Sequence, residues 1–301
     1  MDTTLHAERL ARAREGLEGL SVGDAFGQQY FGNLRLAFRR ELPPDLYWYY
    51  TDDTNMALSI YAMLRQKGVI DQDVLALHFA AHFEDERGYG YGARRLLIAI
   101  RMGEDWRQLA SQMFDGEGSY GNGSAMRIAP LAGYFADDLA VCAEQARLSA
   151  TVTHAHHEGI QGGTAAAVAG AVAWQARRDG VRLTRRALIE AVLPYVAESE
   201  VQRGLIAARD LDGVSALEAA QQLGNGGLIS CQDTVPICLW LAGEFLSSYE
   251  EAFWQTVSIG GDIDTNAAIV GGIVVLYTGA EAIPQAWQAK RERLPAWAIG
   301  A

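Results

Sequence analysis

The sequence predicts an all-α fold. Over most of the 301 residues, apolar side chains recur three and four positions apart, which is the spacing of one face of an α-helix. Runs of Val, Ile and Thr with a period of two, which are typical of half-buried strands, are nearly absent. Ser, Thr or Asp stands before many of the periodic stretches, and such side chains satisfy the free backbone N–H groups of a helix N-terminus. We therefore expect a single compact all-α domain over residues 1–301.

The expected helices follow one another along the chain. The first covers 5–20. The second begins after Thr54 and places Leu58 and Tyr61 on one face, and the third begins after Asp71. Further helices are expected over 92–102, 105–114, 124–135, 138–152, 158–178, 184–197, 199–209, 214–223, 234–246, 249–258 and 266–278. Glycine-rich connections join them.

One long stretch, about 28–50, shows no helical period and contains Pro43 and Pro44. Proline has no backbone N–H group and disfavours helix at the residue before it, so this stretch is predicted to be irregular. The chain contains no internal repeat, low-complexity tract or interdomain linker.

The composition excludes several classes of protein. Asp and Glu number 37 against 25 Lys and Arg, which gives a net charge of −12 at pH 7. Phosphate repels such a chain, so we expect no nucleic acid and no anionic membrane bound by bulk charge. The three cysteines, Cys142, Cys231 and Cys238, have no CxxC spacing, which excludes a disulfide framework and a Cys-rich zinc site.

No segment has the pattern of a membrane span. The first nine residues lack the apolar stretch of a secretory signal. The longest uncharged apolar runs, 159–176 and 265–280, are rich in Gly and Ala and are interrupted by Gln, Thr or Asn. The second is shorter than the roughly 20 residues that a span needs. We expect both runs to be buried core helices, and the protein to be cytoplasmic.

Two acidic clusters carry the strongest chemical signal. The first, at 51–54, reads Thr-Asp-Asp-Thr, and the second, at 260–266, reads Gly-Gly-Asp-Ile-Asp-Thr-Asn; each precedes an expected helix. Neighbouring carboxylates repel one another, and a cation relieves that repulsion. Their oxygens are ligands for Mg²⁺, Mn²⁺ or Ca²⁺ and not for zinc. As the alternative, each cluster only caps a helix. An EF-hand is excluded at the second, because Ala267 and Ile273 occupy the places of its Gly and Glu.

A glycine-rich segment at 116–127 begins with the pattern G-x-G-x-x-G. No strand precedes it, so it is not the fingerprint of a dinucleotide-binding βαβ unit. Glycines still allow successive N–H groups to face an anion, and a helix beginning near Ser124 would add its positive end. The segment is therefore either a diphosphate cradle or a flexible turn.

Aromatic and histidine residues add weaker signals. The segment Arg87–Gly92 places two tyrosine rings on a turn, where they stack on a base or pack internally. His154, His156 and His157 have no acidic or Cys partner at ligand spacing, so an interior or ligand-contacting histidine is expected there and not a metal site. No nucleophile motif such as G-x-S-x-G occurs.

Four of these motifs, in their order, resemble the ADP-ribosylglycohydrolase family, which includes the dinitrogenase-reductase-activating glycohydrolase and the metazoan ADP-ribosylhydrolases. They are the Thr-Asp-Asp-Thr of 51–54, the Gly-Ser-Tyr-Gly-Asn-Gly of 118–123, Thr153-His154, and the Gly-Gly-Asp-Ile-Asp-Thr of 260–265. The resemblance extends from Gly19 to about Trp287. The stretches 87–92 and 116–127 are most similar to the branch that removes ADP-ribose from serine.

The resemblance implies a compact orthogonal helical bundle around two divalent metal ions, Mg²⁺ or Mn²⁺. By motif, the metal ligands would be Thr51, Asp52, Asp53, Asp262, Asp264 and Thr265. The substrate-binding residues would be Phe114, Gly118, Ser119, Tyr120, Gly121, Asn122 and His154. The loop would hold the diphosphate of ADP-ribose, the two rings would flank adenosine, and the histidine would lie near the distal ribose or the phosphates.

One position departs from the family pattern. Residues 19–27 resemble the family's early signature, and four positions later most members place a catalytic glutamate, where this chain has Phe31. Phenylalanine cannot accept a proton, and the loss of a general base typically removes about 10²–10⁴-fold in rate. Three explanations stay open: a substitute carboxylate at Glu41, Glu84, Asp85 or Glu86, reliance on metal-bound hydroxide, or a protein that binds ADP-ribose and barely cleaves it. Asp24, in the same signature, is expected to be a cap or to support the ligands.

These observations together predict a hydrolase with two divalent metal ions that cleaves the bond between ADP-ribose and a protein side chain or another ADP-ribosyl acceptor. The catalytic group is unassigned, with Asp53, Asp264 and Glu84 as candidates. Two alternatives are a catalytically weakened ADP-ribose-binding protein and a related metal hydrolase of another ribosyl or nucleotide compound. The expected partner is ADP-ribose or an ADP-ribosylated protein, and the chain is expected to be a monomer.

Overall fold

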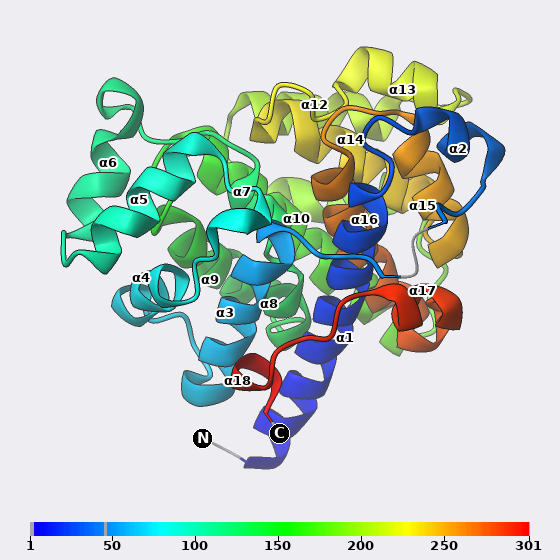
Figure 1. The fold of residues 1–301 in the computed structure, drawn as a ribbon. Coiled ribbons are helices and arrows are strands. Elements are labelled where there is room, and N and C mark those ends of the chain that lie inside the picture. The colour runs from blue at the N-terminus through cyan, green and yellow to red at the C-terminus, as the bar shows by residue number, and fades with distance from the viewer. Residues whose placement is uncertain (1–2, 45–46, 301) are drawn as a thin grey trace.

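The computed structural model describes residues 3–44 and 47–300, and in this part of the chain the all-α prediction is confirmed (Figure 1). It contains no strand there, only two isolated bridges. The α-helices are α1 (Thr3–Gln28), α2 (Leu34–Arg39), α3 (Asp52–Lys67), α4 (Gln72–Ala81), α5 (Tyr91–Arg101), α6 (Trp106–Gly116), α7 (Gly123–Met126), α8 (Ala129–Tyr134), α9 (Leu139–Thr151), α10 (His157–Arg178), α11 (Arg185–Val192), α12 (Glu200–Asp210), α13 (Ala216–Leu223), α14 (Cys231–Glu244), α15 (Tyr249–Ser258), α16 (Ile263–Thr278), α17 (Gln285–Lys290) and α18 (Ala296–Ile299). Three short 3₁₀ helices are η1 (Asp85–Arg87), η2 (Leu193–Tyr195) and η3 (Ala280–Ala282).

The helices α1 and α16 form the central pair of the bundle, and Figure 1 shows α1 running through the middle of the molecule. Glycines on α1 allow this close approach. A Cβ atom on Gly23 would lie 2.3 Å from the carbonyl oxygen of Ala267, and one on Gly27 would lie 2.6 Å from that of Ile263. Real side chains do not fit at such distances, so the two backbones touch. The contact brings the N-terminus of α16 against the C-terminal half of α1.

The other helices surround this pair. Helices α3 and α8 pack on α1, and α10, α14 and α15 pack on α16. Helices α4, α5 and α6 lie on one side of the molecule and α12 and α13 on another (Figure 1). The cap expected at Asp71 is present, and Thr184 and Ser199, the first residues of two expected helices, are N-caps as well: each of the three side chains accepts a hydrogen bond from a backbone N–H of the first helical turn. The described part of the chain contains no helix with the length and apolar character of a membrane span.

Four expected boundaries were wrong. The stretch 28–50 was predicted to be irregular, but it contains α2, and its residues 45–46 lie outside the described residues. The helix expected over 124–135 is divided into α7 and α8, because Pro130 cannot donate the backbone hydrogen bond that a continuous helix needs. Pro194 similarly ends α11 and leaves the 3₁₀ helix η2. The first helix extends to Gln28, eight residues beyond its expected end.

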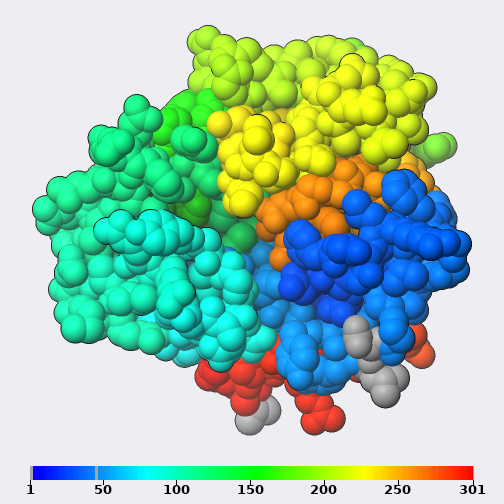
Figure 2. Space-filling model, turned by 45° about the horizontal axis from the view of Figure 1, so that its top comes forward, coloured from blue at the N-terminus to red at the C-terminus, as the bar shows by residue number. Residues whose placement is uncertain are grey.

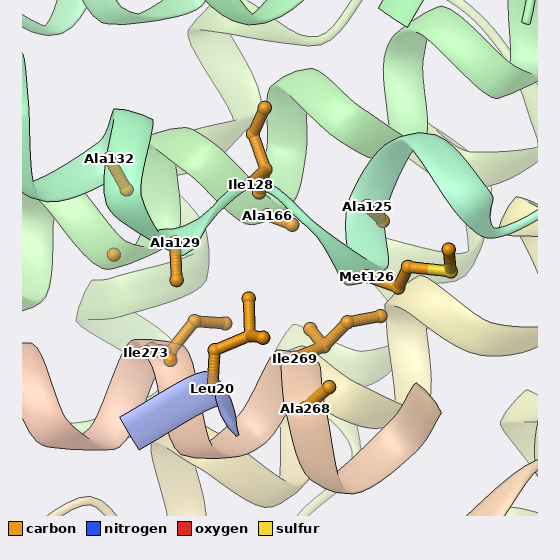
Figure 3. Close-up of a pocket in the computed structure, with 12 residues that line it drawn as sticks. Leu20, Ala125, Met126, Ile128, Ala129, Ala132, Ala166, Ala268, Ile269 and Ile273 are labelled. Atoms are coloured by element: carbon orange, nitrogen blue, oxygen red, sulfur yellow. The ribbon is translucent and has the colours of Figure 1, made fainter. Parts of the chain in front are cut away.

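A small apolar void lies where α1, α8, α10 and α16 meet. Leu20, Ala129 and Ile273 point into it in Figure 3, with no polar atom among the labelled side chains that line it. Its volume is about 10 Å³, the least that a single water molecule needs, and it offers that molecule no side-chain partner. The void is therefore a packing gap of the core and not a ligand site.

Candidate metal and ligand site

The two acidic clusters line one cavity of about 460 Å³. The N-termini of α3 and α16 bring Asp52, Asp53, Asp262 and Asp264 to one part of its wall. The glycine-rich segment, the end of α6 and the start of α5 form the rest of that wall. In Figure 2 this opening lies between the cyan and teal segments on one side and the yellow and orange segments on the other. Clusters from opposite ends of the chain thus meet in space.

Asp24 caps α3 from a different helix. Thr51 is the N-cap residue of α3, yet its own side chain does not cap the helix. Instead the Asp24 carboxylate accepts hydrogen bonds from the backbone N–H groups of Thr51, at 2.9 Å, and Thr54, at 3.1 Å, and from the Thr54 hydroxyl at 2.6 Å. Thus the predicted cap is present, but α1 supplies it to α3. It fixes the position of Asp52 and Asp53, which follow in the first turn.

Three carboxylates converge below the cavity. One oxygen each of Asp24, Asp53 and Asp264 lies within 4.8 Å of the other two. Oδ2 of Asp53 lies 2.9 Å from the Thr51 hydroxyl, whereas Oδ1 is buried and has no hydrogen-bond partner. A buried carboxylate oxygen without a partner is costly unless a cation or a proton satisfies it. The arrangement therefore needs a positive charge at this point.

The pKa values of these carboxyl groups also indicate that a positive charge is required beside them. Burial raises the pKa of Asp52 to about 7, and the nearby Asp24 carboxylate adds to the rise. Burial and the surrounding carboxylates also raise the pKa of Asp53 and of Asp264 well above the usual range. The pKa of Asp24 rises to about 6 through burial, although its hydrogen bonds from Thr51 and Thr54 oppose the change. A divalent cation would oppose these shifts, because it favours the charged form of each carboxyl group.

The donor set fits hard divalent ions. Carboxylate and hydroxyl oxygens predominate, as Mg²⁺ and Mn²⁺ prefer. Asp52, Asp53, Asp262, Asp264 and Thr265 line the cavity, while Thr51 lies just beneath it between Asp24 and Asp53. The six residues predicted as ligands are thus gathered at one place, and the unpartnered Asp53 oxygen is the observation that a metal would explain.

Asn122 connects the acidic wall to the glycine-rich segment. Its side-chain amide donates to Oδ2 of Asp262 at 2.7 Å and to the hydroxyl of Thr234 at 3.1 Å. The donation to Asp262 opposes the rise that burial causes in the pKa of this carboxyl group. The glycine-rich segment, predicted to bind a diphosphate, is therefore hydrogen-bonded to one of the acidic residues predicted to bind a metal ion.

The glycine-rich segment forms an ordered wall of the cavity. Gly118 has a φ of +77°, and a Cβ atom there would lie 2.6 Å from the backbone nitrogen of His156. The Ser119 hydroxyl accepts a hydrogen bond from the Gly121 N–H at 3.2 Å. Residues Ser119–Gly123 and His154 line the cavity; Gly118 lies just beside it. The flexible-turn alternative does not describe this segment, because its backbone is packed and hydrogen-bonded.

Two aromatic rings stand at the rim. Phe114 and Tyr120 are 57% and 44% exposed, and their ring centroids are 6.4 Å apart with planes inclined by 28°. Phe114 has a φ of +52°, a conformation that residues other than glycine rarely adopt. Such backbone strain concentrates at ligand sites. The spacing leaves the two flat faces available to a planar group.

Phe31, at the position of the family's catalytic glutamate, and Glu84, a candidate replacement for it, are not among the described residues that line the cavity. Phe31 is 43% exposed on the turn after α1. Glu84 is bound instead to Arg87, whose Nε lies 2.8 Å from its Oε2. Arg87 also holds Glu292 at 2.6 Å. This ion-paired group joins the 84–88 turn to the C-terminal segment.

Sequence reasoning missed the loop 224–230, which closes another side of the cavity. Leu228 and Ile229 line the cavity and are largely exposed, and Ile229 has a strained φ of +54°. The loop pairs with the glycine-rich segment through an antiparallel bridge between Gly121 and Ser230. The Gly-Asn-Gly-Gly run at 224–227 indicated a loop but not its place beside the cavity.

Comparisons with known proteins agree with this geometry. A model of the ADP-ribosylglycohydrolase family matches residues 5–299. ADP-ribosylhydrolase ARH3 of Mus musculus is 28% identical over an alignment that covers 94% of this chain and 88% of ARH3, and the Homo sapiens protein is 28% identical over 94% and 89%. An uncharacterized protein of Archaeoglobus fulgidus is 30% identical over 91% of this chain and 89% of its own length.

A solved structure described as an ADP-ribosylglycohydrolase-related protein complex superimposes with a TM-score of 0.60 at 27% identity, covering 93% of this chain and 92% of that one. Its likeness extends over nearly all helices of the bundle. The family model spans almost the whole sequence, and the acidic clusters and glycine-rich segment that carried the resemblance meet at one cavity. The protein therefore belongs to the ADP-ribosylglycohydrolase family.

Proposed function

We propose that the protein is a divalent-metal-dependent hydrolase that cleaves the glycosidic bond between ADP-ribose and its acceptor, either a protein side chain or another ADP-ribosyl unit. The observation that carries the proposal is the meeting of Asp53 and Asp264, within 4.8 Å, at the wall of a cavity that continues into the glycine-rich segment. Family membership supports ADP-ribose hydrolysis as the reaction. The resemblance of residues 87–92 and 116–127 to the branch that removes ADP-ribose from serine makes the serine linkage the first to test.

In this proposal Thr51, Asp52, Asp53, Asp262, Asp264 and Thr265 hold two ions, Mg²⁺ or Mn²⁺. When bound, the ions supply Lewis-acid chemistry that orients the hydroxyls of the distal ribose and acidifies a water molecule. The carboxylates serve a second purpose. Cleavage at the anomeric carbon passes through an oxocarbenium-like transition state, and the negative charge of the acidic wall favours this developing positive charge.

The remaining wall binds the rest of ADP-ribose. Within the glycine-rich segment at 118–122, the backbone N–H groups of Gly118, Gly121 and Asn122 already donate inside the protein, so those of Ser119 and Tyr120 are left for the diphosphate. The rings of Phe114 and Tyr120 flank adenosine. His154 contacts the diphosphate or the distal ribose. In this proposal the anion site holds the diphosphate and the cation site holds the distal ribose, so the sugar that carries the scissile bond is fixed at the acidic wall.

The proton of the attacking water goes to a carboxylate of the wall. The acidic residues among the described residues that line the cavity are Asp52, Asp53, Asp262 and Asp264. We assign the role to Asp53 or Asp264, since both lie in the buried group of converging carboxylates. Glu84 is disfavoured because Arg87 holds it away from the cavity.

A second candidate function is ADP-ribose binding with little turnover. It rests on Phe31, which stands where most members of the family have a catalytic glutamate. The two functions make different predictions for Phe31→Glu. Turnover rises at least about 10²-fold if the chain lacks only a base. It changes little if Asp53 or Asp264 already takes the proton.

The test is hydrolysis of a panel of linkages. The protein is incubated with Mg²⁺ or Mn²⁺ and peptides carrying serine- or arginine-linked ADP-ribose, or with O-acetyl-ADP-ribose, and free ADP-ribose is measured. A panel of other ribosyl and nucleotide compounds is run alongside. Release that is abolished by a chelator and in Asp53→Asn, but is retained in the surface variant Asp179→Asn, supports the hydrolase. Tight calorimetric binding of ADP-ribose without release supports the second function, and neither binding nor release contradicts both.

We also propose that the protein is a cytoplasmic monomer. Cys142, Cys231 and Cys238 are buried free thiols, as is usual for proteins of a reducing compartment. The net charge of −12 disfavours nucleic acid and anionic membranes as partners.

A further inference from the structure

Arg127 is a fully buried cation beneath the cavity. It is 0% exposed, and no carboxylate pairs with it in the part of the chain that the structure describes. Its guanidinium lies over the ring of Phe79, 4.6 Å from the centroid. Its Nη2 donates to the carbonyl oxygen of Ser149 at 2.8 Å, and its Nη1 donates to the hydroxyl oxygen of Thr153 at 2.9 Å. An unpaired buried arginine is expensive, so its position calls for a role.

The contact with Thr153 decides where the threonine proton goes. A guanidinium only donates, so the Thr153 oxygen must accept from Arg127. The same oxygen lies 2.7 Å from Nδ1 of His154. Among the described residues these are the only hydrogen-bond partners of the hydroxyl. If His154 donated from Nδ1, the buried hydroxyl proton would have no acceptor. The Thr153 hydroxyl is satisfied both as acceptor and as donor only when it donates to Nδ1.

His154 therefore carries its proton on Nε2. Burial, together with the positive charge of Arg127, lowers the pKa of His154 to about 3, so the ring is neutral and has one N–H group. Nε2 is on the edge that faces the glycine-rich segment: a Cβ atom would lie 3.3 Å from it on Gly121 and 3.0 Å on Gly123. In the described chain this atom has no protein acceptor, and His154 lines the cavity.

We propose that Arg127 is a positioning residue that acts through Thr153 to hold His154 as a neutral Nε2–H donor, aimed at an acceptor oxygen of the ligand in the cavity. The identity of that ligand as ADP-ribose rests on the proposed function, whereas the proton position does not. A donor of this kind recognises a phosphate or hydroxyl oxygen without titrating. Its contribution to binding stays constant between pH 5 and pH 9, unlike that of a protonated histidine.

The proton position is tested first, without a ligand. Ring nitrogens of ¹⁵N-histidine-labelled protein are recorded by NMR at pH 7, and the His154 signals are assigned by their absence in His154→Gln. We expect a protonated Nε2 and an unprotonated Nδ1. Thr153→Val should give a mixture of the two tautomers, and Thr153→Ser, which keeps the hydroxyl, should restore the wild-type pattern. A proton on Nδ1 in the wild type, or a Thr153→Val spectrum like that of the wild type, would overturn the proposal.

Arg127 is tested in the same way with Arg127→Met. The matched control is Arg185→Met, which removes another buried arginine, one that pairs with Asp212 and Glu244 and lies over the ring of Trp240. We expect mixed tautomers of His154 in Arg127→Met and the wild-type tautomer in Arg185→Met. An unchanged tautomer of His154 in folded Arg127→Met would contradict the role of the arginine. If this variant does not fold, the two Thr153 variants still decide whether the Thr153 hydroxyl keeps the proton of His154 on Nε2.

Ligand binding is measured second, with ADP-ribose and Mg²⁺ by calorimetry. We expect Kd to rise about tenfold in Thr153→Val, as for the loss of one hydrogen bond, and to recover in Thr153→Ser. Equal affinities in the two Thr153 variants would overturn the claim that the fixed donor serves the ligand. Failure of the wild type to bind ADP-ribose would contradict the proposed function. The NMR result would then still decide whether Arg127 and Thr153 fix the proton of His154.

Discussion

The side-chain amide of Asn122 donates a hydrogen bond to Asp262 at 2.7 Å, across 140 positions of sequence. The glycine-rich segment thereby holds one of the acidic residues at the start of α16. The two walls of the cavity are thus parts of one network, in which the groups that suit a diphosphate also orient a group that suits a metal ion. A substitution in either wall should therefore change the affinity of the other wall for its ligand.

Asn122→Ala tests this link. Removal of the donor leaves the buried Asp262 carboxylate with less support for its charged form, since the amide opposes the rise in its pKa. We expect the Kd for Mg²⁺ to rise about tenfold by calorimetry, and the Kd for ADP-ribose to rise with it. Gln66→Ala, which removes an exposed amide at the opposite end of α3 from Asp52, is the control. Weaker ADP-ribose binding with unchanged Mg²⁺ affinity would show that the walls act separately.

Asp264→Asn should change stability in opposite directions with and without metal. Without metal, the substitution removes a negative charge from a buried group of carboxylates and should raise the melting temperature. In the wild type, Mg²⁺ at 100 times its Kd should stabilise the fold by about 2.7 kcal/mol, and most of this gain should be lost in the variant. Thermal melts with a chelator and with Mg²⁺ measure both effects. An unchanged metal stoichiometry in Asp264→Asn would argue against its role as a ligand.

His154 should make the fold less stable in acid. Its pKa is about 3 in the folded protein, below the roughly 6.5 of an unfolded histidine. Between these values the unfolded chain binds more protons, so the free energy of unfolding falls as the pH falls. From pH 7 to pH 5 the wild type should lose about 2 kcal/mol more than His154→Gln, which has no titrating ring. Urea unfolding at both pH values measures the difference, and parallel losses in the two proteins would contradict a neutral buried ring.

Gly27→Ala should weaken metal binding although it replaces none of the proposed ligands. A Cβ atom at this position would lie 2.7 Å from the Cα atom of Asp264, so the N-terminus of α16 must move away from α1. We expect a loss of about 1–3 kcal/mol in stability and a clear loss of Mg²⁺ affinity. Gly133→Ala is the matched control, because its Cβ atom would meet the carbonyl oxygen of Arg12 at 2.5 Å, and no cavity residue. Equal Mg²⁺ affinity in both variants would contradict this role of Gly27.

Local patterns predicted much of the fold but not its long-range contacts. Most helices and the cap at Asp71 were predicted, because periodicity and capping depend on neighbours in sequence. The acidic clusters and the glycine-rich segment were found as motifs, but their meeting was predicted only by the family resemblance, since spacing says nothing about distance in space.

Other features had no local signal at all. Asp24 caps a helix that begins 28 positions later, so its partners are invisible from its own neighbourhood. Arg127 falls within the helix expected over 124–135, and only the packed structure shows that its side chain is fully buried. The pairing of loop 224–230 with the glycine-rich segment likewise depends on how α14 is placed.

The contact between Gly27 and the start of α16 also has a mechanical consequence. The proposed ligands stand at the N-termini of α3 and α16, and α16 is packed against α1, so a bound ion would link the first and the last thirds of the chain at the centre of the bundle. Its removal should speed cleavage of the folded protein by a protease that attacks transiently opened states. Limited digestion with and without a chelator measures this difference in cleavage rate. In Gly27→Ala the protection by Mg²⁺ should be smaller, while the rest of the digestion pattern stays the same.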